Sequence, residues 1–504
     1  MKAARVEEEG LAGSVLSGDG RRSRPSGAAQ PSMPRDGSDV GAVLAAFLQQ
    51  HGLTHAQLAD RLGVDRTYVS KILSGRRQIR DVGRLRQVAH AIGVPPERFG
   101  LFPDPRETAD VSSPRHIVAH EVRQDAEAWR DVREVLNHRR PELTKVASSL
   151  YSGAERIAGT PLIASSEWMP VQPVDLEAVR LAWTDNHPLP FLTGQETETE
   201  PCRPLMPHSG RYPRYCQAIR DLNPPSLFEN RASYRLLDLG CDGCHQRYGY
   251  TTYFDMVDVC EAVAHEVAAA WLRHDGDAAQ IRRSELPFRT LIGNPFDLTR
   301  RVVLPSVDTL TIRHDTRTGT SSLLLHRRNP DNVAIAGGMT HIMPAGVFQP
   351  SGIAPWNVSA DFDIWHNILR ELSEEFLGDP EHDGSGGEPV DYESQEPFAS
   401  LNAARSAGDI RVWYLGTGLD PLTLAGEILT VLVIDADVFD QIFANVVAWN
   451  SEGDVVFSGD GSVGVPWRRD TVYRLLAAEP LAPAARACLE LAWKHQDLLL
   501  GSRG

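Results

Sequence analysis

Three glutamates in the C-terminal part of the chain have a spacing suited to metal chemistry. Glu371, Glu374 and Glu375 stand at positions i, i+3 and i+4, so on a helix they would share one face. Carboxylate oxygens are ligands that Mg²⁺ prefers. A magnesium ion held there could activate a water molecule for attack on a bound substrate. The alternative is that these acids form a solvated helix face without a ligand.

A second group of residues, near the N-terminus, has the composition of a DNA-contacting helix. Segment 66–73 predicts a short helix with Val69 and Ile72 on its buried side. The outer face is then polar and basic, and arginine there can contact guanine bidentately. Residues 60–90 hold eight basic and three acidic side chains, although the whole chain has a net charge of −16. The candidate DNA-contacting residues are Arg66, Thr67, Tyr68, Ser70, Lys71, Arg76 and Arg77.

Four short helices are predicted to position these basic residues. Apolar residues from Val40 to Leu48 repeat with the helical period, and Thr54 with Gln57 predicts a capping box at the start of a second helix. Gly63 permits a tight turn before the third helix. The expected helices span 40–51, 54–62, 66–73 and 81–92. Two helices joined by a tight turn, the second of them exposed, form the helix-turn-helix arrangement.

The stretch LTHAQLADRLGVDRTYVSKILSGRRQI, residues 53–79, resembles the Xre/Cro/repressor family of helix-turn-helix domains over its whole length. The resemblance implies a regulator that binds double-stranded DNA, with Gln57 at a position that commonly contacts DNA. Because one such module reads a single half-site, we also expect a homodimer. The alternative is a four-helix domain that binds protein.

The segments SSLLLHRRNPDNVAIAGGMTHIMPAGVFQPSG and NILRELSEEFLGD resemble a Nudix domain. Arg370, Glu371, Glu374 and Glu375 match the helical part of the family's box. The resemblance implies that Glu374 and Glu375 bind Mg²⁺, that Glu371 is a further ligand or the catalytic base, and that Arg370 orients them. Glu427 begins a later strand, at the rough position of a distal acid. Arg370 and Glu427 are therefore also candidate ligand-binding residues.

The box departs from the family pattern. Counting from Gly346, its first glutamate falls on Gly352, and Arg370 lies about ten residues too far along the chain. Counting back from Arg370 instead reaches Phe362, which Asp361 and Asp363 flank. A degenerate box behind a DNA-binding module favours a sensor of a nucleotide-like or diphosphate ligand, so we lean against an enzyme. The alternative is an Mg²⁺-dependent hydrolase of nucleoside diphosphate derivatives with a DNA-binding appendage.

The sequence Cys241-Asp-Gly-Cys244-His245 matches the CxxCH pattern of haem attachment. We find no export segment to go with that chemistry. Zinc binding would need Cys260 or His265 as a further ligand. Incidental free thiols are the favoured interpretation, because six cysteines in 504 residues do not form a disulfide framework.

The chain is too long for one hydrophobic core, so we expect a multidomain protein. The predicted regions are a disordered tail at 1–37, an all-α helix-turn-helix domain at 38–102, a mostly helical region at 115–300, a Nudix-like α+β domain at 301–480 and a C-terminal helix at 481–504. Met33 is a candidate for the true start. Helices are expected at 130–150 and 257–272, strands at SSLLL, NVAIAG and ILTVLVI, and an acidic mobile loop at 379–396.

Composition narrows the class of protein further. Hydrophobic residues make up 42% and charged residues 23%, as in ordinary globular proteins. No apolar run approaches the length of a membrane span, so we expect a cytoplasmic protein without a membrane partner. The negative net charge argues against a protein that coats nucleic acid over its whole surface.

Overall fold

The structure is a computed structural model of the chain. It describes residues 40–51, 53–62, 64, 66–74, 76, 79, 82–92, 94, 120–157, 159–206, 210–225, 228–240, 242–328, 339–352, 354–379, 388–444, 453–455, 464–478 and 480–501. The chain divides into two compact units, Met1–Ile117 and Val118–Gly504. The tail expected at 1–37, Met33 and the NVAIAG segment lie outside the described residues.

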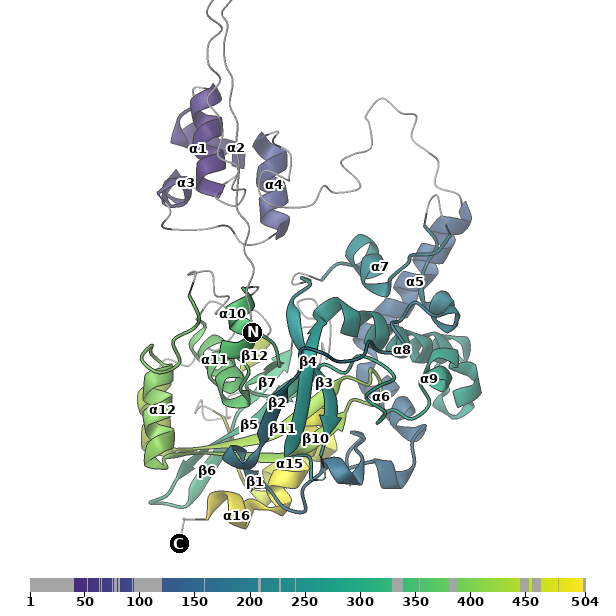
Figure 1. The fold of residues 1–504 in the computed structure, drawn as a ribbon, viewed down its shortest axis with the longest axis vertical. Helices are drawn as coiled ribbons and strands as arrows, with labels where there is room; N and C mark the ends of the chain where they lie inside the picture. The colour runs from purple at the N-terminus through teal and green to yellow at the C-terminus, as the bar shows by residue number, and fades with distance from the viewer. Residues whose placement is uncertain are drawn as a thin grey trace, which may run out of the picture. The chain divides into compact units, whose positions relative to one another are not determined.

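The N-terminal unit contains the four expected helices (Figure 1), which are α1 (Val40–His51), α2 (His55–Leu62), α3 (Arg66–Leu73) and α4 (Val82–Ile92). Leu44, Leu58, Val69 and Val88 each come from a different helix and are buried in one shared core. The predicted capping box at Thr54 is formed: the Gln57 amide N–H donates to the Thr54 hydroxyl oxygen at 3.3 Å. Local sequence patterns therefore predicted these four helices correctly.

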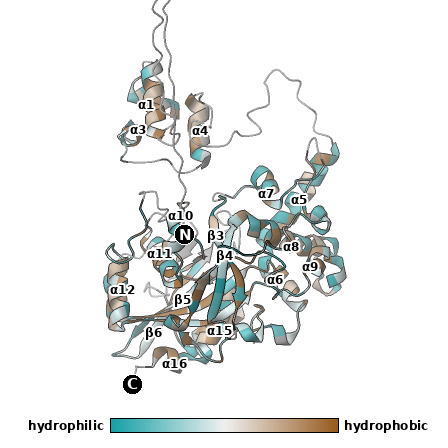
Figure 2. Cartoon of the chain, in the orientation of Figure 1, coloured by the Kyte–Doolittle hydropathy of each residue, from teal (hydrophilic) through white to brown (hydrophobic). Residues whose placement is uncertain are grey.

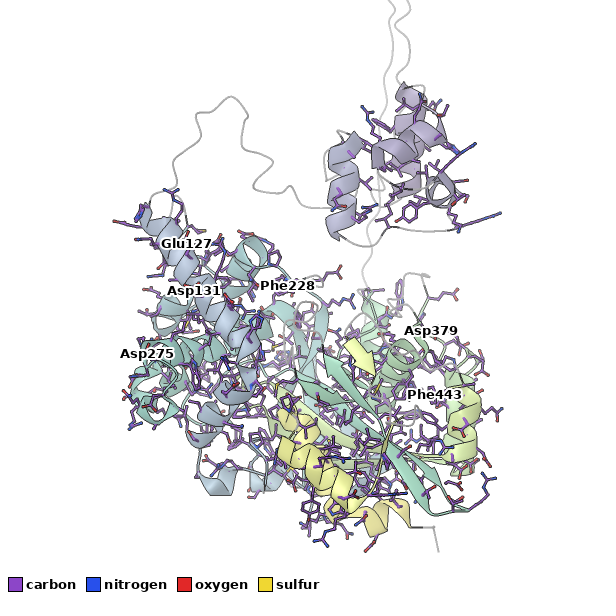
Figure 3. The ribbon with its side chains drawn as sticks, turned by 180° about the vertical axis from the view of Figure 1, so that it is seen from behind. Glu127, Asp131, Phe228, Asp275, Asp379 and Phe443 are labelled. Atoms are coloured by element: carbon purple, nitrogen blue, oxygen red, sulfur yellow. The ribbon has the colours of Figure 1, made fainter. Side chains whose placement is uncertain are left out.

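The first part of the second unit combines several helices with a small sheet. The helices are α5 (His120–His138), α6 (Arg140–Ser149), α7 (Tyr215–Leu222), α8 (Tyr253–Arg273) and α9 (Pro287–Ile292). The single helix expected at 130–150 is wrong. Pro141 lies in the first turn of α6, where its missing N–H costs nothing, and the chain turns at Arg139. Glu127 and Asp131 lie on the exposed side of α5 (Figure 3).

Three strands interrupt the region that we expected to be mostly helical. They are β2 (Arg180–Trp183), β3 (Ala232–Leu239) and β4 (His245–Thr252), in the order β2-β4-β3. β2 pairs with β4 in parallel, and β3 pairs with β4 antiparallel. Tyr234 and Tyr248 point from this sheet into the main core, where they contact Phe348 and Phe362. β3 and β4 are consecutive antiparallel strands, whereas β2 joins the sheet by pairing with a strand more than sixty residues later, which no local pattern encodes.

A larger mixed sheet forms the centre of the second unit. Its order is β1-β10-β11-β5-β6-β13, with β9 also paired to β5. The strands are β1 (Val174–Asp175), β5 (Pro305–Asp315), β6 (Thr320–Leu323), β9 (Ala345–Val347), β10 (Ile410–Leu419), β11 (Gly426–Asp435) and β13 (Val465–Pro466). β5 and β11 run parallel, with Leu310 opposite Val431. A third sheet has the order β12-β7-β8 and contains β12 (Gly453–Val455), β7 (Leu325–Arg328) and β8 (Thr340–Ile342).

Helices cover both faces of the large sheet. On one face, α11 (Ile364–Leu377) packs into a core with Val307 and Ile428. On the other, α15 (Pro483–Lys494) packs against Leu310 and Leu429. The apolar colouring of β5 and α15 in Figure 2 agrees with these cores. The other helices here are α10 (Pro355–Ala360), α12 (Phe398–Ala407), α13 (Ala436–Ile442), α14 (Arg469–Ala478) and α16 (Gln496–Leu500).

These packing contacts unite residues that we had expected to lie in separate regions. One hydrophobic cluster includes Trp129, Tyr215, Val259, Leu372 and Phe443. Figure 3 labels Phe443, whose ring centroid lies 5.1 Å from that of Phe376 on α11. Neither residue 300 nor residue 481 therefore separates compact units, and residues 118–504 form one unit.

A buried histidine gives this unit a predicted pH dependence. His265 Nδ1 of α8 lies 2.8 Å from the Tyr215 hydroxyl, and the rings of Trp129 and Tyr215 enclose the imidazole. Burial, with the nearby Arg133 guanidinium, lowers the pKa of His265 to about 3. The unfolded chain binds a proton at His265 below about pH 6.5, whereas the folded unit does not until about pH 3.

Stability should consequently fall as the pH drops through this window. Between about pH 6.5 and pH 5, His265 alone should remove about 2 kcal/mol from the free energy of unfolding. We expect His265→Gln to lose this contribution and show a flatter pH dependence in urea unfolding followed by tryptophan fluorescence. His245→Gln is the matched control, because His245 is exposed. Equal slopes for His265→Gln and the wild type would contradict the prediction.

Candidate nucleic-acid interface and acidic site

Helix α3 separates its residues into a buried and an exposed face. Val69 and Ile72 are buried in the core of the N-terminal unit. The exposed side chains of α3 are those of Arg66, Thr67, Ser70 and Lys71, and Tyr68 is half-buried. Two apolar anchors therefore fix a helix whose solvent face carries two cations and two hydroxyls. Such a face can reach base edges with arginine and phosphates with lysine.

The remaining predicted DNA-contacting residues lie around α3. Gln57 is exposed on α2, and its Oε1 accepts hydrogen bonds from the amide and hydroxyl of Thr54 at 2.9 and 3.0 Å. This capping arrangement fixes the side chain at the start of α2. Arg76 is exposed. Arg77 lies outside the described residues.

The three predicted glutamates lie on α11, and two of them, Glu371 and Glu375, contact strand β9. Asp363 caps the N-terminus of α11 by accepting from the Trp365 amide at 2.6 Å, and Gly378 ends the helix in the left-handed region with φ 69°. Glu375 Oε1 accepts from the Ala345 amide of β9 at 3.1 Å. Glu371 lies directly against Gly346, because a Cβ built on that glycine would come within 1.9 Å of Glu371 Oε1. The structure thus brings Gly346 into contact with Glu371, which belongs to the helical part of the predicted box.

Arg370 is held by other side chains of the protein. Its guanidinium donates to the Tyr392 hydroxyl at 2.6 Å and to the Gln349 carbonyl at 2.8 Å. Asp361 Oδ1 lies 3.7 Å from Arg370 Nη1 and accepts from the Tyr392 hydroxyl at 2.6 Å. Burial opposes the charge of Asp361, but Arg370 and hydrogen bonds from Ser351 and Tyr392 hold its pKa below the ordinary value.

This network accounts for the extra residues that lie between Gly346 and Arg370 in the predicted box. Of the two acids flanking Phe362, Asp361 pairs with Arg370, while Asp363 caps α11. Asp361 also accepts from the amide and hydroxyl of Ser351, both at 2.7 Å, so it ties the loop after β9 to α11. Sequence reasoning had marked Asp361, but it missed Tyr392, which lies in the 379–396 stretch expected to be a mobile loop. No local pattern around Tyr392 indicates its partners.

Glu427 lies on the opposite side of the sheet from the core of α11. Its Oε2 accepts from the Ser306 hydroxyl at 2.6 Å, and the same hydroxyl lies 3.4 Å from Asp308 Oδ2. The nearby thiol of Cys488 on α15 donates to the Asp308 carbonyl at 3.8 Å. Burial and the Asp308 carboxylate raise the pKa of Glu427 well above its ordinary value. The structure therefore does not bring Glu427 together with Glu371 and Glu375.

The α11 glutamates match Mg²⁺ in ligand type but not in arrangement. Oxygen donors of this kind suit a hard cation. However, within the described ranges no group of three His, Cys, Asp or Glu side chains is placed to hold a metal ion. One oxygen of Glu375 already accepts from β9.

The CxxCH residues do not form a zinc site in the described structure. Cys241 lies outside the described residues. Cys244 is buried, which raises the pKa of its thiol to about 11, whereas His245 is exposed on β4. Cys260 is buried inside α8, and His265 is hydrogen-bonded to Tyr215. The cysteines that the structure describes are all free thiols.

A comparison with known protein families identifies the kind of domain in the first unit. A family model described as a helix-turn-helix domain matches residues 39–100, the segment that contains α1 to α4. No curated protein matches the chain. Among the helices in the described ranges, none combines the length and the apolar character that a bilayer crossing requires. The chain thus has a helix-turn-helix domain at its N-terminus, followed by a mixed α/β unit with several sheets, and this domain suggests a DNA-binding regulator.

Proposed function

We propose that this protein is a transcriptional regulator that binds operator DNA through α3. The observation that carries the proposal is the exposed face of α3, with Arg66, Ser70 and Lys71 outside and Val69 and Ile72 in the core. A recognition helix needs this division, because a firmly anchored helix presents its polar side chains to the major groove at a fixed angle. The matched helix-turn-helix family supports the same role.

A second copy of the chain completes the proposed DNA-binding species. One recognition helix reads one half-site, so a homodimer would read two half-sites related by symmetry. The negative charge of the whole chain limits nonspecific attachment elsewhere, while the basic residues near α3 face the DNA.

The experiment that tests DNA binding is selection of genomic fragments by the purified full chain. Bound fragments are sequenced, and the strongest is titrated in fluorescence anisotropy over a series of salt concentrations. We expect one or a few fragments with a pseudo-palindromic sequence, and affinity that falls steeply with salt because counterions are released. Uniform weak binding to every fragment, or none, would refute the proposal.

We further propose that the C-terminal unit is Nudix-like and senses a nucleotide-like or diphosphate compound at α11. The proposal is supported by the match of Arg370, Glu371, Glu374 and Glu375 to the family's box and by the contact between Glu371 and Gly346. Helices on both faces of a mixed sheet are compatible with it. Ligand binding would shift the population between DNA-competent and DNA-incompetent arrangements.

The second candidate is an Mg²⁺-dependent hydrolase of nucleoside diphosphate derivatives. It is motivated by the match of Glu371, Glu374 and Glu375 to the family's box, in which these acids share one face of α11. The hydrolase and the sensor differ in one measurable consequence: only the hydrolase consumes its ligand.

A substitution of the acid pair separates the sensor from the hydrolase. Purified protein, Mg²⁺ and a pool of nucleoside diphosphate compounds are incubated and followed by mass spectrometry. The sensor proposal predicts no consumption by wild type or by the Glu374→Gln, Glu375→Gln variant, and intact DNA binding in both. A hydrolase would consume a compound at a rate that falls at least about 100-fold in the double variant, because charge stabilisation is lost. Glu393→Gln, at an exposed acid, is the control.

A further inference from the structure

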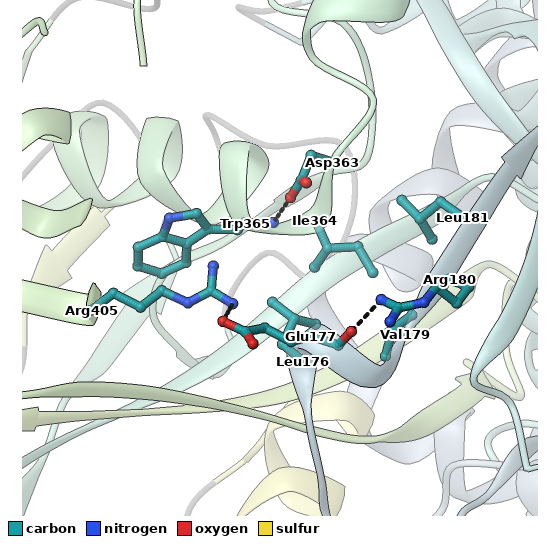
Figure 4. Close-up of a pocket in the computed structure, with 9 residues that line it drawn as sticks. All are labelled: Leu176, Glu177, Val179, Arg180, Leu181, Asp363, Ile364, Trp365 and Arg405. Carbon is teal, nitrogen blue, oxygen red and sulfur yellow. Dashed lines mark hydrogen bonds and ion pairs between the residues drawn. The ribbon is translucent and has the colours of Figure 1, made fainter. Parts of the chain in front are cut away.

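A surface pocket beside the N-terminal end of α11 is separate from the glutamates of the proposed ligand site. It has a volume of about 440 Å³. η4 (Leu176–Ala178) and β2 form one wall, and α11 and α12 form the other (Figure 4). Leu176, Val179 and Ile364 are buried side chains that supply an apolar floor. A small organic body could rest on this floor without burying a polar group.

Arg405 lies at the edge of this pocket and is held there by an aromatic ring. Its guanidinium stacks on the Trp365 ring, 4.8 Å from the centroid, and the side chain is only 20% exposed. Trp365 is itself held by a hydrogen bond from its Nε1 to Asn402 Oδ1 at 2.7 Å. Among the described residues, none accepts a hydrogen bond from the Arg405 side chain. A stacked, largely desolvated guanidinium of this kind is organised to bind an oxyanion.

Glu177 occupies the position that a ligand anion would take. Its Oε1 lies 3.7 Å from Arg405 Nη2, which is too long for a hydrogen bond, and its side chain is 79% exposed. Arg180, on the other side of Glu177, donates from Nη1 to the Glu177 carbonyl oxygen (Figure 4). The pocket thus has two guanidinium groups and one weakly held carboxylate, which a bound anion can displace. Because Glu177 is exposed and too far from Arg405 for a hydrogen bond, this ion pair contributes little stability, and its loss costs little.

We propose that this pocket binds a small organic anion, a carboxylate or a phosphate monoester, through Arg405 with assistance from Arg180. The apolar body of the anion would contact Leu176, Val179 and Ile364. The other lining acid, Asp363, uses its carboxylate to cap α11. This inference does not rest on the proposed DNA binding or on the α11 glutamates, so it can fail or succeed independently of both.

The test uses three probes with the same aromatic body and different head groups. Fluorine NMR line broadening of para-fluorobenzoate, para-fluorophenyl phosphate and para-fluorobenzyl alcohol is measured with the full chain. We expect the two anions to bind and the neutral alcohol to bind at least tenfold more weakly. The tighter anion then assigns the natural head group. Equal binding of the alcohol, or no binding of either anion, would overturn the proposal.

Variants locate the binding and separate it from folding. Arg405→Gln should weaken anion binding at least tenfold, and Arg405→Lys should weaken it less, because it keeps the charge but loses the planar fork. Glu177→Gln should strengthen binding severalfold by removing the competing carboxylate, an effect that damage to the fold would not produce. Arg317→Gln, which removes an exposed arginine outside the pocket lining, should match the wild type. Binding that Arg405→Gln and Glu177→Gln both leave unchanged would overturn the assignment.

Discussion

The double substitution Arg66→Ala, Lys71→Ala is expected to reduce specific DNA affinity by roughly 100-fold or more. An arginine that contacts a base bidentately contributes about 1–3 kcal/mol of discrimination, and a lysine on a phosphate adds an ionic contact. Both side chains are exposed on α3 and have no part in its core. Removing them should therefore change binding without unfolding the domain.

The single variants should separate base recognition from phosphate contact. Arg66→Ala is expected to relax sequence preference at one position of the half-site. Lys71→Ala should weaken binding to all fragments alike and reduce the slope of log affinity against log salt by about 1. Arg84→Ala is the control, because it removes one charge from α4 of the same unit. Equal losses from Arg84→Ala and Arg66→Ala would contradict recognition by α3.

The substitution Glu261→Gln is expected to destabilise the C-terminal unit by about 3–5 kcal/mol, because breaking a buried ion pair leaves charge uncompensated. The side chain of Glu261 on α8 is only 1% exposed. Its carboxylate accepts a hydrogen bond from the Arg133 guanidinium of α5, and its Oε1 lies 3.5 Å from Arg140 Nη2 of α6. The carboxylate thus joins three helices and separates two buried cations. Without its charge, the two guanidinium groups repel each other in a region of low dielectric constant.

Urea unfolding followed by tryptophan fluorescence measures this loss in the intended unit. The first of the ten tryptophans is Trp129, so the fluorescence reports only on residues beyond Ile117. Glu142→Gln on α6 is the matched control: its exposed pair with Arg139 should contribute under about 1 kcal/mol. DNA binding by the helix-turn-helix unit can be measured in the same sample. Equal stabilities for Glu261→Gln and Glu142→Gln would contradict the role assigned to Glu261.

The sequence by itself determined the N-terminal unit and the helix that carries the glutamates. Caps, glycine stops and apolar spacing act within a few residues, so α1 to α4 could be predicted one at a time. The exposure of Arg66 and Lys71 followed from the burial of Val69 and Ile72 on the same helix. Matching Arg370, Glu371 and Glu375 to the family's box likewise needed only the local amino-acid sequence.

The tertiary structure decided what depends on distant strands. Glu427 opposes Ser306 because β11 pairs with β5 across more than a hundred residues, and the pleat then turns Glu427 away from the core of α11. Asp361 reaches Arg370 only after the chain has folded through α10. Sequence periodicity specifies which face of an element is buried, but not which distant element covers it. For the same reason, the parallel pairing of β2 with β4 and the pocket around Arg405 could not be predicted from local sequence.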